Sequence, residues 1–490
     1  MSQWIARILF GAAVAFIIGS AIWNNIVTNR LIEEATGRDL EAQQRALTLL
    51  SEREDFFDLI QSRRPPRRLR VAIGAESLNN AIGVKVALAM LRDPEPRVRD
   101  RFLQALLKIG GSNLDALAEG LKNPDANVKN GTVKVMVQLG VRCLPVALKA
   151  FENADARSAA TEVLVQFGNA SVPGLLEILN RATDEGLKLD AITALGRIGD
   201  HRATDALLPY LNLPTEKKRI VLVALGTIAD PRTEPILIEA LRSPAEDPDA
   251  RAQVALGLGQ MGTPAAIRAL IEALGDPDLQ VADAAAQGLQ KAGTRALDAL
   301  AQALNEKRVG IRLRAVAALS GISEARSVEL LRRALHDPDA RVQRAAADAL
   351  GGVGRPEAIP ALIDALRASD GGVAMSAVRS LSRVGAPAVP ALLNTLRQLS
   401  QLEGEPTGEP SGASDQLTAA YFAALAISQI PEAETALLRA AQEPRTRRYA
   451  LIALKERRSL AAKPLFEQAL HAPDPALRQI AREALMQLSP

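Results

Sequence analysis

Apolar residues recur at helical spacing along most of the chain, and the stretch from His336 to Leu366 shows the pattern in full. Two apolar stripes follow each other there, each with the i, i+3, i+4 spacing of one helix face: Val342, Ala345, Ala346, Ala349 and Leu350, then Ile359, Leu362, Ile363 and Leu366. Asp337–Pro338 predicts a helix start before the first stripe, because Asp accepts from free first-turn amides and Pro needs no donor there. The chain can turn between the stripes at three glycines, Gly351, Gly352 and Gly354. The stretch therefore predicts one helical hairpin.

Copies of this hairpin recur about every 30 residues from about residue 80 onward. The spacing can be read from the residues at which one helix of each copy closes: Gly110, Gly140, Gly168, Gly199, Ala229, Gly262, Gly293, Ser323, Gly354, Gly385, Pro431 and Arg458. The helix start recurs too, at Asp93–Pro94, Asn123–Pro124, Asp247–Pro248, Asp276–Pro277 and Asp337–Pro338. A single hairpin cannot bury both stripes, so the copies must stack. The pattern predicts an all-α solenoid of about 13 hairpins over residues 81–490.

The hairpins resemble HEAT repeats, in particular the short bacterial type that is also seen in phycobilin lyases. The resemblance rests on the repeat length, the Asp-Pro helix starts and the glycine turns, and it covers roughly residues 80 to 490. It implies a right-handed α-solenoid whose second helices line the concave face. No catalytic motif of the phycobilin lyases can be matched residue by residue, so the resemblance implies the fold and nothing more.

Composition agrees with closely stacked helices. The 490 residues are 48% hydrophobic but only 3% aromatic, so Ala and Leu must supply most of the core. A net charge of +3 with 23% charged residues gives a mixed surface and argues against nucleic acid as a partner. The single cysteine, Cys143, cannot form an internal disulfide.

The chain opens with an uncharged apolar run, Ile8 to Trp23. Trp4 and Trp23 suit the two interfacial belts of a bilayer, and Ile26 and Val27 can extend the run. We therefore expect segment 1–29 to form a single transmembrane helix that contacts the membrane through residues 4–27.

The location that follows is the cell (inner) membrane, with one span. A short amino end carrying Arg7 before the run resembles a signal anchor, which favours a solenoid outside the cytoplasm. A cleaved signal peptide is the alternative, because Gly19 and Ala21 suit a cut before Ile22. The protein would then be secreted or periplasmic.

Residues 30–80 are expected to lead from the membrane to the solenoid. Asp39 to Ser62 reads as one long amphipathic spacer helix capped by Asp39. An Arg/Pro-rich linker follows, where Pro65 and Pro66 break the helix among five arginines: Arg63, Arg64, Arg67, Arg68 and Arg70. These arginines either remain solvated or contact anionic lipid head groups or an acidic partner.

A row of basic residues occupies the first turn of the second helix in most repeats: Arg99, Lys129, Arg157, Lys188, Lys218, Arg251, Arg312 and Arg341. By the resemblance, the row would line a concave groove and could bind an acidic protein. The competing interpretation, which we favour, is a structural ladder in which these residues pair with the turn aspartates Asp93, Asp276 and Asp337.

The repeat is interrupted once, by a flexible loop expected at 401–415 between the two helices of a hairpin. Its Gly, Pro and Glu content cannot bury apolar area. Functional and neutral interpretations of this insertion remain equally open.

The sequence contains no recognisable catalytic motif. It has no Gly-rich phosphate loop, no HExxH, no paired cysteines and no G-x-S-x-G. His201, His336 and His471 are expected in turns far apart along the solenoid, and Cys143 is expected to be a buried small side chain. We therefore expect no catalytic, cofactor-binding or metal site.

These features favour a membrane-tethered protein–protein interaction scaffold, as a non-catalytic subunit or assembly factor of a membrane complex. The expected partner is another, membrane-associated protein, with no nucleic acid and no small-molecule substrate. The alternative is a lyase-like enzyme or enzyme subunit related to the HEAT-repeat phycobilin lyases.

Overall fold

The computed structural model describes residues 27–53, 55–61, 63–402 and 413–488. Every regular element in these ranges is a helix, and they contain no strand, as the hydrophobic periodicity predicts. The predicted membrane run, Ile8 to Trp23, lies outside the described residues. The chain forms two compact units, Met1–Leu211 and Asn212–Pro490, which are described separately.

The first unit begins with residues 27–35, which are helical. The helices that follow are α2 Leu40–Leu50, α3 Phe56–Gln61, α4 Pro65–Leu78, α5 Ala81–Ala89, α6 Pro96–Ile109, α7 Leu114–Ala118, α8 Ala126–Leu139, α9 Leu144–Glu152, α10 Ala154–Gln166, α11 Val172–Arg181, α12 Glu185–Ile198 and α13 Thr204–Leu207.

The second unit continues the same alternation. Its helices are α14 Thr215–Ile228, α15 Glu234–Arg242, α16 Pro248–Met261, α17 Pro264–Ala273, α18 Leu279–Ala292, α19 Leu297–Ala303, α20 Val309–Ser320, α21 Ala325–Ala334, α22 Ala340–Val353, α23 Ile359–Ala365, α24 Gly371–Val384, α25 Val389–Leu402, α26 Ala413–Ser428, α27 Glu434–Ala440, α28 Arg447–Glu456, α29 Lys463–Ala469 and α30 Pro475–Leu488. From α5 onward the chain order gives thirteen pairs, α5/α6 to α29/α30, as the repeat spacing predicts.

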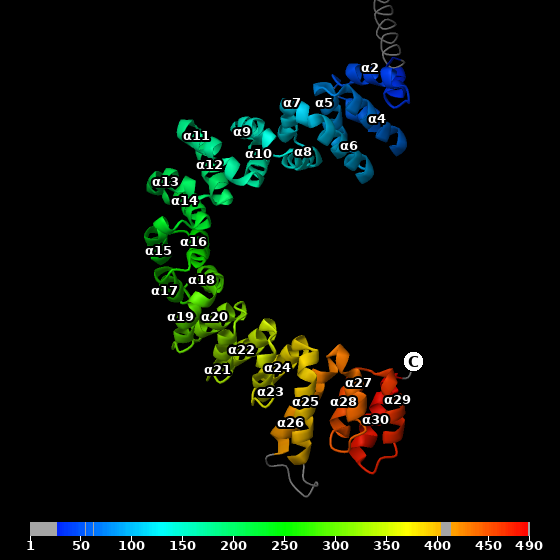
Figure 1. The fold of residues 1–490 in the computed structure, drawn as a ribbon, viewed down its shortest axis with the longest axis vertical. Helices are drawn as coiled ribbons and strands as arrows, with labels where there is room; N and C mark the ends of the chain where they lie inside the picture. Colours follow the sequence, from blue (N-terminus) through cyan, green and yellow to red (C-terminus); the bar gives the residue numbers. More distant parts are fainter. Residues whose placement is uncertain (1–26, 54, 62, 403–412, 489–490) are drawn as a thin grey trace, which may run out of the picture. The chain divides into compact units, whose positions relative to one another are not determined.

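Each unit is built in two layers (Figure 1). Even-numbered helices stack on one another, for example α6 on α8 in the first unit, and α16 on α14 and α18 in the second. Odd-numbered helices form the other layer and pack against the even-numbered helix that follows, as α21 does on α22. This stacking is that of an α-solenoid.

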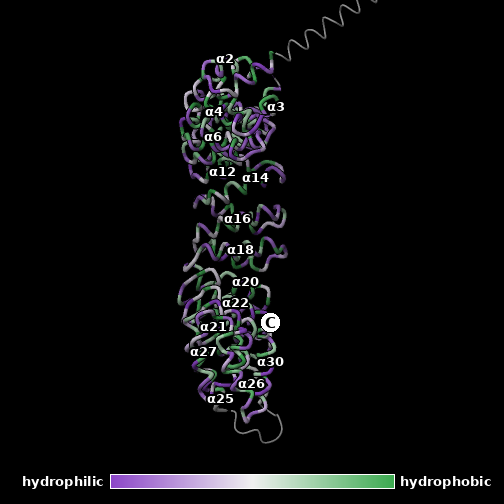
Figure 2. Tube along the Cα trace, turned by 90° about the vertical axis from the view of Figure 1, so that its right-hand side faces the viewer, coloured by the Kyte–Doolittle hydropathy of each residue, from purple (hydrophilic) through white to green (hydrophobic). Residues whose placement is uncertain are grey.

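The two predicted stripes point into the space between these layers. Val342, Ala346, Ala349 and Leu350 of α22 are buried, and so are Ile359, Leu362 and Leu366 around α23. Ala345 and Ile363 are half-buried, at the edges of their stripes. Hydrophobic positions recur along every repeat rather than gathering in one central core (Figure 2).

The predicted turns are confirmed by the backbone. Nine of them adopt a positive φ, between 53° and 80°: Gly140, Gly168, Gly199, Ala229, Gly262, Gly293, Gly354, Gly385 and Arg458. Four of these residues, Gly199, Ala229, Gly262 and Gly354, cap their helix in the left-handed conformation. Gly140, Gly293 and Gly385 combine the positive φ with a ψ between −134° and −163°.

Four of the five predicted helix starts are wrong by two residues. The helix α22 begins at Ala340, and its N-cap is Asp339 rather than Asp337. Asp337 instead accepts a bond of 2.9 Å from the amide of Asp339 and closes a turn before the helix. The same shift occurs at Asp93–Pro94, Asn123–Pro124 and Asp276–Pro277, whereas Asp247 caps α16 as predicted.

The region before residue 81 is more helical than predicted. Asp39 does cap α2, but the expected long helix ends at Leu50 and α3 follows as a separate short helix. The expected Arg/Pro linker is the helix α4, in which Pro65 and Pro66 occupy the first turn, where proline is tolerated. Since α4 packs against both α2 and α6, hairpin stacking starts before residue 81.

The predicted insertion lies, as expected, between the two helices of a hairpin, α25 and α26. Its ends differ from the prediction, because residues 401–402 and 413–415 belong to these helices. Residues 403–412 lie outside the described part of the chain.

Within the described ranges no single helix combines the length and the apolar character that crossing a bilayer requires. The segments Ala126–Leu139 and Val141–Glu152 meet these criteria only as a pair, with a bend of 117° between them.

Three stacked helices of the second unit approach each other at glycines. A Cβ atom on Gly257 of α16 would collide with the backbone carbonyl of Gly226 in α14. On the other side of α16, a Cβ on Gly259 would collide with the backbone of Gly288 in α18. Because backbone cannot move aside as a flexible side chain can, these positions hold α14, α16 and α18 at a separation that excludes any larger residue.

The Gly257→Ala substitution should therefore destabilise the second unit by about 1–3 kcal/mol through overpacking. Its matched control is Gly352→Ala in α22, where a Cβ meets no atom within 4 Å. That substitution should stabilise α22 by about 0.5–1 kcal/mol, because Ala is the better helix former. Hydrogen exchange resolved by helix measures both changes. Equal effects of the two substitutions would show that the glycine contacts do not limit the stacking.

Candidate partner-binding surface

Arg312, a member of the predicted basic row, lies in the first turn of α20 and is held by two sets of hydrogen bonds. Its Nε and Nη2 donate to the two carboxylate oxygens of Asp337 at 2.7 and 2.8 Å. Its Nη1 donates to the carbonyls of Glu306 and Lys307 at 2.9 and 3.1 Å. The two side chains are only 9% and 6% exposed. One guanidinium thus joins the turn before its own helix to the turn of the next hairpin.

We call such an Arg–Asp pair, 25 residues apart in the sequence, a rung of the ladder. Two other rungs occur. Arg251 pairs with Asp276 and also donates to the carbonyl of Leu241 at 2.9 and 3.0 Å. Arg68 pairs with Asp93 at 2.7 and 2.9 Å. The structural ladder is therefore confirmed at Arg251 and Arg312.

Arg68 corrects the prediction of a lipid contact for this residue. It is 6% exposed, and its guanidinium is held by Asp93, so it forms a rung of the ladder. The signal that could have identified it is the 25-residue distance to Asp93, which Arg251–Asp276 and Arg312–Asp337 share. The cluster of arginines and prolines suggested a linker instead.

The other four arginines of that cluster lie on or beside α4. Arg63 and Arg67 form ion pairs with Glu33, at 3.2 and 2.6 Å. The Nε of Arg70 donates to the carbonyl of Thr36 at 2.9 Å. Arg64 is exposed at the N-cap of α4. Most of the cluster thus ties α4 to the helix that ends at residue 35, and only Arg64 remains directed to solvent.

The remaining members of the basic row are held in several ways. Arg99 donates to the carbonyls of Asp93 and Pro94, Arg157 pairs with Asp190 at 3.2 Å, and Lys218 pairs with Glu246. Arg341 is exposed and pairs with its own helix cap, Asp339, because it lies two residues before the rung position. Two of the eight residues of the basic row, Lys129 and Lys188, have no side-chain hydrogen bond or ion pair within the described part of the chain. Both are half-buried.

One rung of the ladder has lost both charges. Gln343 occupies the position in α22 that Arg312 has in α20, and it donates to the carbonyl of Asp337 at 2.7 Å as the arginine would. Ala368 lies 25 residues later, where an aspartate would complete the rung. A groove of about 540 Å³ opens at this place between α21 and α23.

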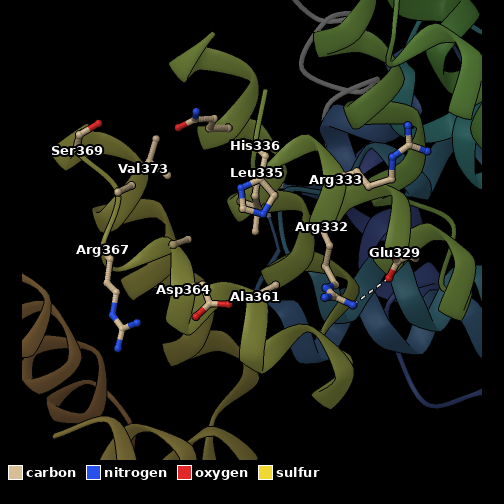
Figure 3. Close-up of a pocket in the computed structure, with 13 residues that line it drawn as sticks. Glu329, Arg332, Arg333, Leu335, His336, Ala361, Asp364, Arg367, Ser369 and Val373 are labelled. Atoms are coloured by element: carbon tan, nitrogen blue, oxygen red, sulfur yellow. Dashed lines mark hydrogen bonds and ion pairs between the residues drawn. The ribbon is translucent and has the colours of Figure 1, made fainter. Parts of the chain in front are cut away.

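This α21–α23 groove has an apolar floor and a charged rim (Figure 3). Leu335, Ala361, Ala365 and Val373 form the floor and are buried. The rim carries Glu329, Arg332, Arg333, His336, Asp364 and Arg367. Arg332 turns toward Glu329, at 2.9 Å, whereas Arg333 and Arg367 extend at opposite ends of the groove. Such a floor and rim suit a protein segment with apolar and polar faces.

A second groove lies in the first unit, between α3, α5 and α7. It measures about 600 Å³, and its lining includes Phe56, Leu88 and Ala116. The guanidinium of Arg92 lies 4.9 Å from the centre of the Phe57 ring and holds α3 beside the groove. Both grooves run across neighbouring hairpins, so each unit offers a surface that no single repeat could form.

The described residues contain no group of three or more His, Cys, Asp or Glu side chains that could hold a metal ion. Cys143 is buried as expected, and burial raises the pKa of its thiol although Arg142 lowers it, so the thiolate is disfavoured. His336 lines the α21–α23 groove together with Glu329 and Asp364.

A family model of HEAT repeats matches residues 144–220, 213–290, 268–342 and 328–401, which together span more than half of the 490 residues. The chain belongs to the HEAT-repeat family. No curated protein sequence matches it significantly.

Several solved structures match the chain at low identity. Importin beta in an ammonium sulfate condition is 14% identical, with a TM-score of 0.40 over 94% of this chain and 66% of that one. Kap121p bound to Pho4p is 14% identical, with a TM-score of 0.38 over 95% and 61%. Human deoxyhypusine hydroxylase in complex with glycerol is 23% identical, with a TM-score of 0.23 over 55% and 95%. At these scores the likeness carries no argument about partners or activity.

Replacing Asp337 with Ala should cost about 3–5 kcal/mol around α20–α22, because Arg312 would remain buried without its counter-charge. The double variant Arg312→Gln/Asp337→Ala copies the natural Gln343/Ala368 rung, so it should recover at least half of that loss. Local hydrogen exchange of α20 and α22 measures both variants. If the double variant is as unstable as the single one, the cost does not come from the unpaired guanidinium.

Asp339 should make a separate contribution in acid. The side chain and the backbone amide of Arg341 donate to it and lower its pKa from 3.8 to about 2. A folded-state pKa below the unfolded value means that the stabilisation is complete above pH 3.8 and is lost as the pH falls through about 2. Wild type should therefore lose more stability than Asp339→Asn over this interval, as thermal unfolding at fixed ionic strength would show. Parallel curves for the two proteins would contradict the shift.

Proposed function

We propose that this protein is a membrane-tethered protein–protein interaction scaffold, acting as a non-catalytic subunit or assembly factor of a membrane complex. The observation that carries this proposal is the α21–α23 groove, an apolar floor with a charged rim that crosses neighbouring repeats. Its dimensions and lining suit a helix or extended segment of another protein. The groove of the first unit adds a second surface of the same kind.

The tether is proposed from the sequence of Ile8 to Trp23 together with contacts of the helical residues that follow it. Glu33 pairs with Arg63 and Arg67, and the carbonyls of Ala35 and Thr36 accept from Gln43 and Arg70. A span that leads into this helix would therefore be connected firmly to α2 and α4. Tethering would raise the local concentration of a membrane partner without any new contact.

The proposed location is the inner membrane, with the repeats outside the cytoplasm. The partner would be a protein of the same membrane, because a weak groove-bound contact gains most from a shared anchor. The lyase-like alternative has a direct test, since bound pigment in the purified protein would favour it.

Deleting residues 1–27 should release a folded, soluble protein. That protein should lose its partner in cells, yet bind it at high concentration in vitro, because the grooves remain intact. The measurement is membrane fractionation followed by identification of co-purified proteins by mass spectrometry. As a control, fusing an unrelated single transmembrane helix before Thr28 should restore partner recovery. A mature protein that begins at Ile22 and is found free in solution would refute the tether and leave the scaffold in place.

A further inference from the structure

At several positions of the ladder the basic residue is present without an aspartate 25 residues later, and Arg447 is the one that lines a cavity. Arg447 of α28 and Ala472 are separated by 25 residues, the same distance as Arg312 and Asp337. At the Gln343/Ala368 rung both charges are absent together, so no charge is left over. At Arg447 the guanidinium remains, and the place of its carboxylate is taken by a methyl group.

The backbone before Arg447 resembles that before Arg312, but the guanidinium is turned differently. The Nε and Nη2 of Arg447 donate to the carbonyls of Ala441 and Gln442, six and five residues earlier, at 3.2 and 3.3 Å. Arg312 bonds the carbonyls six and five residues earlier through Nη1 and gives its Nε and Nη2 to Asp337. Within the described residues the Nη1 of Arg447 therefore remains available for an acid.

The turn on the other side matches as well. Ala472–Pro473–Asp474 follows the pattern of Asp337–Pro338–Asp339. Asp474 accepts from the amide of Ala476 at 2.8 Å, as Asp339 accepts from the amide of Arg341 at 2.9 Å. Asp474 is thus occupied as a helix cap, and it does not replace the missing carboxylate.

A cavity of about 300 Å³ marks the vacant position. Arg447 lines it together with Ala472 and His471, while Leu451, Leu465 and Ala469 supply apolar surface. The nearest acid along the chain, Glu443, is held by Arg397 at 3.1 Å through both of its oxygens. Within the described residues Arg447 forms no ion pair, so its charge faces the cavity without a carboxylate.

We propose that this cavity is a docking site for an aspartate or glutamate side chain of a partner protein, whose carboxylate binds the guanidinium of Arg447 from the side of Nη1. Charge complementarity selects a carboxylate, since a partly buried guanidinium gains most from a planar, bidentate acceptor. The apolar lining selects a hydrophobic residue beside that acid. The inference rests on the proposed scaffold function and adds the chemistry of one contact.

The probe is a fluorescent twelve-residue peptide with a central Leu-Asp-Leu, and its control carries Leu-Asn-Leu. The full chain in detergent should bind the Asp peptide about tenfold more tightly than the Asn peptide, because only the carboxylate makes charge-assisted bonds to Arg447. Fluorescence anisotropy measures both affinities. No binding of the Asp peptide at about 1 mM, or equal binding of both peptides, would overturn the proposal.

Two variants locate the contact. Ala472→Asp should restore the internal rung, raise the thermal stability of the last repeats and abolish binding of the Asp peptide by filling its place. Arg447→Gln should remove the preference for Asp over Asn. Its matched control is Arg99→Gln, since Arg99 also bonds the carbonyls six and five residues earlier but does not line this cavity.

The same variants separate this inference from the scaffold function. If Ala472→Asp leaves peptide binding unchanged, the carboxylate site is wrong. If it blocks the peptide but the chain still recovers its membrane partner, that partner does not use the site, and the scaffold proposal stands on the other grooves. Loss of both would place the partner's acid at Arg447.

Discussion

Every part of this protein depends on the burial of one hairpin against the next. A helix such as α22 carries a stripe of Val, Ala and Leu that is too long to cover with its own hairpin partner, so the neighbouring hairpins must cover it. Small residues let the even-numbered helices approach closely, to the point that Gly257 and Gly226 meet through their backbones. The core is therefore a sequence of similar contacts, and stability is distributed along the chain rather than concentrated at one centre.

Charged residues reinforce this stacking at the hairpin turns. In the Arg312–Asp337 rung, the guanidinium binds carbonyls in the turn before its own helix, and the carboxylate closes the turn that precedes α22. A buried ion pair of this kind adds little net stability compared with a neutral pair, yet it penalises the loss of either member strongly. The natural Gln343/Ala368 rung agrees with this view, because both charges are replaced together there.

Two incomplete rungs coincide with openings in the surface. In the complete Arg312–Asp337 rung the two side chains lie between adjacent turns. Beside Ala368 and Ala472, where the aspartate is missing, there is a groove and a cavity.

The hydrophobic pattern by itself determined the helical hairpins, their number, their closing turns and buried positions such as Leu350. These features depend on contacts within a hairpin or between adjacent copies, and their period is visible along the chain. Tertiary structure decided the rest. The 25-residue spacing of Arg68 and Asp93 is present in the sequence, but the stacking of α4 on α6 is what brings the two side chains together. Asp337 is not the helix cap that was predicted, because it binds Arg312 and the amide of Asp339 instead. The partner of a charged group depends on distances between neighbouring turns, which a list of residue types does not contain.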